Sequence, residues 1–216
     1  MKTRHNRNHR SIFFLMLLTG CVRLSASPVI SEVFYDAQGG DNGYTFIELY
    51  GSPGDILDGY RLEAINGTNG STYLQIALTG IIPDDGIFVV ADKIGDITYI
   101  SVADLLATAN LQNGPDSLIL TTDAGIIDAL AYGDFSSSQF SAGEGQPAPG
   151  TGPGSSLARR TPWFDTDENA IDFSIFSTPT PGSIPSTPVP VPSSIALLFS
   201  GFLALAGYIR RYSGQR

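Results

Sequence analysis

The feature that most constrains the fold is a series of short runs rich in Val, Ile, Tyr and Phe, each bounded by Gly, Asp, Asn or Pro. Seven runs are clear: "PVISEVFYD", "YTFIELY", "GYRLEAIN", "STYLQIAL", "GIFVVAD", "DSLILTT" and "GIIDALAYG". Weaker runs stand at "ITYISV" and "SLARR". Only "VADLLATANL" has helical spacing, and a short helix or an irregular loop fits it equally well. This many short strands with so little helix predicts an all-β sandwich.

The N-terminal residues 1–27 have a different composition and predict a signal peptide. A basic stretch leads into the apolar "SIFFLMLL" and then into small residues, which is the layout of a secretory signal. Within it, "LTGC" resembles the lipobox of bacterial lipoproteins, in which the cysteine, here Cys21, is lipidated. Cleavage by signal peptidase and lipoprotein processing both stay open, and both export the protein.

The C-terminal residues 193–216 predict a membrane segment. Their apolar run, Ser193–Ile209, would form a helix of ~17 residues and ~25 Å, slightly short of a ~30 Å hydrocarbon core. Arg210 and Arg211 close the run, and the positive-inside rule places them in the cytoplasm and the preceding domain outside. The Pro-rich residues 183–192 predict a semi-rigid polyproline II linker.

This tail resembles the PEP-CTERM sorting signals of Gram-negative bacteria, because a Pro-x-Pro step, a short apolar span and an arginine pair follow one another. Pro190, Val191 and Pro192 form the step, and Arg210 and Arg211 form the basic end. Val191 stands where many members of that family carry Glu. The resemblance implies that an exosortase, a membrane cysteine protease, recognises the tail and cuts near the step. The protein would be anchored in the inner membrane with its domain outside, and would then stay at the cell surface or be secreted.

Residues 28–182 resemble the lamin tail domain family in sequence and spacing. The resemblance begins with "ISEVFYD", "FIELY" and "LDGYRLEAIN" and is most specific from "GEG" through "SSLARR" to "DTDENAIDF". Gly51, after "FIELY", departs from the Asn that the family usually places there. The resemblance implies an immunoglobulin-like β-sandwich.

Charge and residue types exclude several kinds of function. Between the two terminal segments lie all 21 acidic residues and four basic ones, so this part has a net charge of 4 − 21 = −17 and should avoid nucleic acid. His5 and His9 fall in the signal segment, and Cys21 is removed or lipidated. The mature domain therefore has no Ser-His-Asp site, no Cys-His site, no zinc site built from His or Cys, and no disulfide. No cofactor is expected.

Carboxylate chemistry is what remains, and paired acids can serve a hydrolase such as a glycosidase. Glu32 and Glu48 are the pair to consider, because each lies mid-strand between apolar residues. Strand alternation directs both side chains away from the core. We therefore interpret them as exposed or hydrogen-bonded strand residues rather than as a catalytic dyad.

Calcium is the candidate ion. Asp165, Asp167 and Asn169 have the one-three-five spacing that begins a calcium loop, and hard oxygen ligands suit this cation. Position six of that loop is Ala170 instead of Gly, and no Glu stands at position twelve. Capping of a tight turn is therefore the favoured interpretation, with the arginines of "SSLARR" as partners for the acids.

The sequence thus predicts an exported, non-catalytic module that binds or scaffolds material at the cell surface, such as extracellular polysaccharide or surface proteins. Two alternatives stay open. One is a secreted hydrolase that depends on carboxylates, and the other is a calcium-stabilised adhesin.

Overall fold

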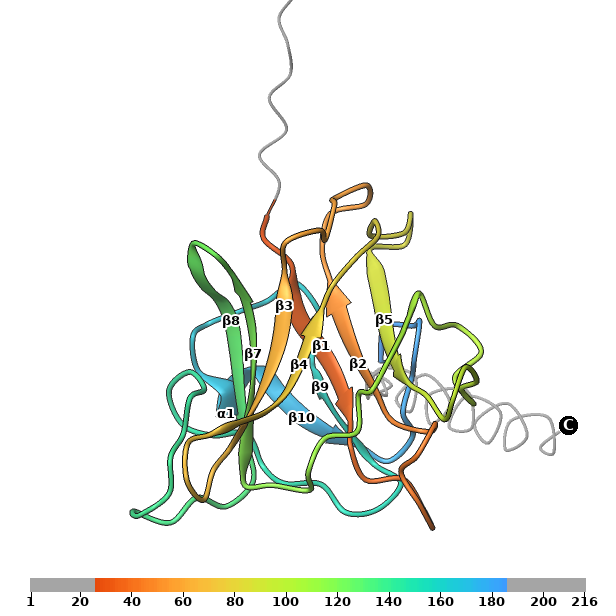
Figure 1. Ribbon diagram of the computed structural model, residues 1–216. Helices are drawn as coiled ribbons and strands as arrows, with labels where there is room; N and C mark the ends of the chain where they lie inside the picture. Colours follow the sequence, from red (N-terminus) through yellow and green to blue (C-terminus); the bar gives the residue numbers. More distant parts are fainter. Residues whose placement is uncertain (1–25, 186–216) are drawn as a thin grey trace, which may run out of the picture.

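The structure, a computed structural model, describes residues 26–185 and consists of two β-sheets that pack as layers (Figure 1). Each of the seven clear runs forms a strand, because alternating apolar residues can bury one face of a pleated sheet. The elements in chain order are β1 (Val29–Phe34), β2 (Phe46–Tyr50), β3 (Arg61–Asn66), β4 (Thr72–Ala77), β5 (Ile87–Asp92), β6 (Leu105–Ala107), β7 (Asp116–Thr122), β8 (Gly125–Tyr132), β9 (Ser156–Arg159), α1 (Asn169–Asp172) and β10 (Phe173–Phe176).

The larger sheet has six strands in the order β10-β9-β1-β2-β5-β6, and the smaller has four in the order β4-β3-β7-β8. Neighbouring strands are antiparallel except β5 and β6, which are parallel. The predicted all-β class is confirmed, since the one helix of the described residues spans four residues.

The core lies between the two sheets and draws fully buried side chains from both. Ile47 and Leu49 of β2 face Leu118 and Leu120 of β7, with Leu130 of β8 in the same cluster. Burial of each such side chain contributes about 1.5–3 kcal/mol relative to exposure. The alternation seen in the sequence is therefore the alternation between this core and the outer faces.

A bulge in β1 sets the register of the larger sheet. The pairing with β2 shifts between Ile30 and Glu32, so Ser31 is an extra residue. Ile30 and Val33 both reach the core, although three positions separate them. Beyond the bulge, Glu32 stands directly opposite Glu48.

Residues 177–185, which follow β10, form a segment without regular secondary structure that we call the C-terminal strap. The strap crosses the face of the six-stranded sheet that points away from the smaller sheet, where Thr180 bonds to Glu32 and Gly182 bonds to Glu48. That outer face has an apolar cluster of its own, made by Phe46, Ile87 and Val89.

Two local predictions differ from the structure, and a third is confirmed. Residues 97–102 form no strand, because Tyr99 instead stacks on Tyr44 and bonds to Gly43. "VADLLATANL" contains the edge strand β6 rather than a helix, since its backbone pairs with β5. The weak run "SLARR" is confirmed as β9, which also pairs with β10, a strand the pattern did not indicate.

The predicted targeting segments fall almost wholly outside the described residues. These comprise most of the signal peptide with Cys21, and the tail with Pro190, Val191, Pro192, Arg210 and Arg211. Within residues 26–185, no helix combines the length and the apolar character that crossing a bilayer demands.

Candidate functional site

Arg159, the last residue of β9, is completely buried and links the two sheets. Its Nη2 donates to Asp128 on β8 at 2.8 Å, and its Nε donates to the carbonyl of Ile30 on β1 at 2.8 Å. The other carboxylate oxygen of Asp128 accepts the N–H of Ile30. An arginine and an aspartate from opposite sheets therefore hold one residue of β1 from both sides.

The same guanidinium holds the loop before helix α1. Its Nη1 donates to Asp172 at 3.0 Å, to Asp165 at 3.2 Å and to the carbonyl of Phe164 at 3.1 Å. Asp172 also accepts the backbone N–H and the hydroxyl of Thr166 at 2.9 and 2.8 Å. Burial raises the pKa of Asp172, but these hydrogen bonds and the positive charge outweigh burial and lower the pKa.

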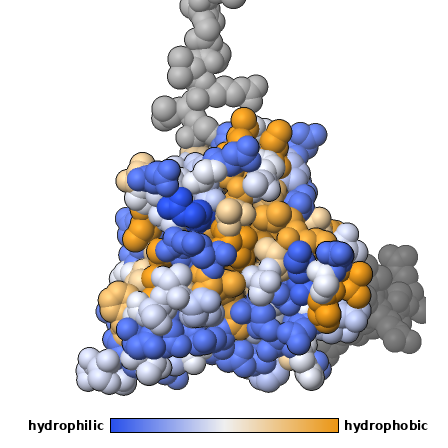
Figure 2. Space-filling model, viewed as in Figure 1, coloured by the Kyte–Doolittle hydropathy of each residue, from blue (hydrophilic) through white to orange (hydrophobic). Residues whose placement is uncertain are grey.

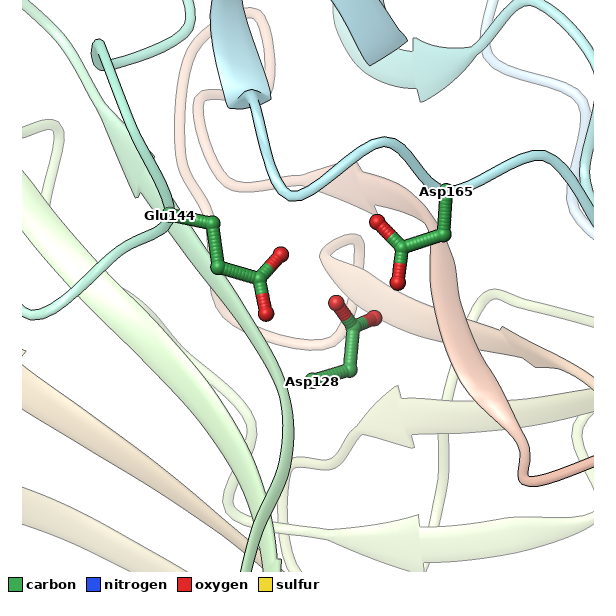
Figure 3. Close-up of side chains that lie close together, drawn as sticks. All are labelled: Asp128, Glu144 and Asp165. Atoms are coloured by element: carbon green, nitrogen blue, oxygen red, sulfur yellow. The ribbon is translucent and has the colours of Figure 1, made fainter.

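A third carboxylate joins this group. The carboxyl groups of Asp128, Glu144 and Asp165 converge, and a ligand atom of each lies within 4.8 Å of those of the others (Figure 3). Oε2 of Glu144 is buried without a hydrogen-bond partner among the described residues. Burial, and then the charges of Asp128 and Asp165, raise the pKa of Glu144 to about 8. Burial also raises the pKa of Asp128, against the attraction of Arg159.

The acid cluster, made by Asp128, Glu144 and Asp165, carries more negative charge than Arg159 alone can balance, so one more positive charge would stabilise it. Both oxygens of Asp128 already accept hydrogen bonds, and one oxygen of Asp165 accepts from Arg159. Calcium takes six to eight oxygen ligands, so the cluster has too few free oxygens for an all-protein site. A proton on Glu144 needs no such set of oxygen ligands, and it removes the repulsion between Glu144 and the charges of Asp128 and Asp165. The geometry therefore fits a protonated Glu144 near neutral pH.

The residues that the sequence indicated for calcium take different positions. Asp165 belongs to the acid cluster. Asn169 is buried, and its side-chain oxygen accepts the N–H groups of Ala131 at 2.8 Å and Glu144 at 3.0 Å. Asp167 has a φ of 55° and donates its N–H to Asp165 at 3.3 Å, as in a side-chain-capped turn. Calcium binding by Asp165, Asp167 and Asn169 stays a prediction, although the oxygen of Asn169 is already occupied.

Sequence reasoning missed Asp128 and Glu144. Asp128 is the one charged residue of β8, and the strand is buried from that position to its end. A charge inside a buried strand requires a partner, and this signal could have identified Asp128. Glu144 lies in a loop, where its sequence neighbours give no comparable signal.

Glu32 and Glu48 face away from the core as predicted, but they are not exposed. Their exposed fractions are 0% and 1%, because the C-terminal strap covers them. Glu32 accepts the N–H and the hydroxyl of Thr180 at 3.0 and 2.7 Å, and Glu48 accepts the N–H of Gly182 at 2.9 Å. The hydrogen-bonded interpretation of the pair therefore applies.

An exposed aromatic pair lies elsewhere on the surface. Tyr44 and Tyr99 stack with ring centroids 4.2 Å apart and 14° between their planes, and they are 45% and 54% exposed. Beside Tyr44 in the chain, Asn42 accepts a hydrogen bond from the amide of Asn110 at 3.1 Å. Figure 2 shows that other apolar residues also reach the surface, whereas hydrophilic residues dominate the lower end of the view. Tyr44 and Tyr99 lie far apart in the sequence, so no local motif predicts that they stack.

Comparisons of the chain with family models, with curated proteins and with solved structures give no match.

The buried position of Arg159 generates a first prediction. Arg159→Leu should lower the free energy of unfolding by about 3–5 kcal/mol, because it leaves Asp128 and Asp172 buried without their cation. Arg159→Lys should rescue little, since an ammonium cannot reproduce the planar fork. Urea denaturation would measure both. The matched control is Arg160→Leu at the exposed neighbour, and equal losses at the two positions would contradict a special role for Arg159.

The pKa of Glu144 generates a second prediction. Between its ordinary value of 4.5 and about 8, the folded state holds a proton that the unfolded state has lost. Stability is then fully present below the lower value and declines as the pH rises through this window. Glu144→Gln mimics the protonated form, so the variant should melt above the unaltered protein at about pH 9 and show a flatter dependence of Tm on pH.

The control for this series is Asp134→Asn, at an exposed acid outside the acid cluster. If added calcium raised the Tm of the unaltered protein but not that of Glu144→Gln, the acid cluster would be a cation site instead.

Proposed function

We propose that this chain is an exported, non-catalytic module of the immunoglobulin-like β-sandwich type that binds neutral polysaccharide outside the cell. Its signal peptide directs export, and its tail holds it in the inner membrane until an exosortase cuts near the Pro-x-Pro step. The two-sheet all-β architecture supports the likeness to lamin tail domains on which the fold type rests.

The position of the acids is the observation that supports a non-catalytic role. Glu32 and Glu48 lie beneath the strap, where a substrate cannot reach them. Asp128 is fully buried and bonded to Arg159 and to the backbone of Ile30. A glycosidase needs two acids on either side of an accessible glycosidic bond. We therefore assign Glu32, Glu48 and Asp128 a structural role.

The choice of ligand follows from the surface. Sugar rings present C–H faces that pack on aromatic rings, and hydroxyl groups that bond to amides. Tyr44 and Tyr99 supply exposed rings, and Asn42 and Asn110 supply amides near them. Because the central part has a net charge of 4 − 21 = −17, it repels polyanions. Neutral polysaccharide is therefore favoured over acidic polysaccharide.

The binding surface is tested by removing a ring. Tyr99→Ala should weaken binding to neutral glycans on an array by about 5- to 30-fold, which corresponds to about 1–2 kcal/mol for a lost aromatic contact. The matched control is Trp163→Ala, at another exposed aromatic side chain. Binding that persists in Tyr99→Ala but fails in Trp163→Ala would locate the ligand elsewhere.

The tail is tested by changing both prolines of the step. A plain anchor needs only apolar length and a cytoplasmic charge pair, so Pro190→Ala with Pro192→Ala would leave it unaffected. A sorting signal needs the extended backbone that proline enforces, so the double variant should stay full length in the inner membrane. Mass spectrometry of the C-terminal fragment, in the native host and in a host without exosortase, measures this. Retention of residues 193–216 in both hosts by the unaltered protein would contradict processing.

A further inference from the structure

The C-terminal strap is held to the sheet by two acids, neither of which forms an ion pair within the part of the chain that the structure describes. Glu32 and Glu48 are direct cross-strand partners on β1 and β2, and both are fully buried. Like charges in that position repel each other, and burial adds a desolvation cost. The strap sequence "STPTPGSIP" contains no Lys, Arg or His, so it contributes only hydroxyl and backbone N–H donors.

The strand positions paired with the two glutamates supply no positive charge. On the same sheet, Glu48 pairs with Val89 on β5 and Glu32 pairs with Ala158 on β9, and neither neighbour carries a charge. Asp85, just before β5, adds a further negative charge that acts on Glu48. Among residues 26–185, the one further charge that acts on the pair is thus acidic, and a proton can neutralise one of the two glutamates.

The hydrogen bonds show where this proton fits. Both oxygens of Glu32 accept from Thr180, which is the pattern of an ionised carboxylate. Glu48 accepts from Gly182 with one oxygen, and its other oxygen lies 2.9 Å from the hydroxyl of Ser31. A hydroxyl can accept as well as donate, so a proton on that second oxygen of Glu48 keeps the contact with Ser31.

We propose that Glu32 and Glu48 form a proton-dependent latch, which holds the strap on the sheet while Glu48 keeps its proton and releases the strap when the proton is lost. Burial, followed by the charge of Glu32, raises the pKa of Glu48 to about 8. In the released state Glu48 is exposed to water and regains its ordinary pKa. The closed latch is therefore most stable below about pH 4.5 and weakens as the pH rises through about 8.

Hydrogen exchange of the full chain tests the latch directly. Residues 179, 181 and 185 are prolines, so six strap residues carry a backbone N–H, and those of Thr180 and Gly182 bond to Glu32 and Glu48. After correction for intrinsic exchange, the opening constant of the strap should rise about tenfold for each pH unit between about pH 5 and about pH 8. Peptides from β1 and β2 should keep their protection.

The decisive variant is Glu48→Gln, which is neutral at every pH and should make the opening constant depend much less on pH. Burial also raises the pKa of Glu32, so a weaker slope remains. The matched control is Glu63→Gln on β3, which should keep the slope of the unaltered protein. Thr180→Val, which leaves the sheet unchanged, removes one donor to Glu32 and should raise the opening constant at every pH without changing the slope. A flat profile in the unaltered protein, an unchanged slope in Glu48→Gln, or loss of protection in β1 and β2 together with the strap would overturn the proposal.

Discussion

One buried guanidinium joins the two sheets of this domain, which no strand ladder connects. An arginine cannot shed its proton, so Arg159 is stable in the interior only while every acceptor around it is in place. Its donors reach β1, β8, helix α1 and the loop before that helix. The same geometry gathers more carboxylates than one cation can balance. The raised pKa of Glu144 is thus a consequence of how the sheets are joined.

Buried acids also fix the loops, which have few regular backbone partners. Asp92 accepts the N–H groups of Gly43 and Ala109 at 2.7 and 2.9 Å, and Asp116 accepts that of Gly67 at 2.7 Å. A carboxylate can satisfy two backbone donors at once, which suits a chain with long connections between short strands. Part of the acidity of the domain is therefore structural.

Sequence patterns predict those features of the fold that depend on near neighbours. The period of two identifies the long strands and the face on which Glu32 and Glu48 lie. It does not identify β6 and β10, because these short edge strands exist through pairing with β5 and β9. Nor does it show the strap that covers the two glutamates, since 148 positions separate Thr180 from Glu32. The acid cluster was missed for the same reason.

The latch and the acid cluster respond to pH with the same sign, although they lie at different places. In each, one glutamate has a pKa of about 8, because burial and neighbouring acids disfavour its charged form. In both cases the folded state binds the extra proton. Lowering the pH therefore stabilises both the loops near Arg159 and the attachment of the strap. The strap shares residues 183–185 with the predicted Pro-rich linker, residues 183–192. Its release would therefore add residues 177–185 to the length of chain between the β-sandwich and the predicted tail.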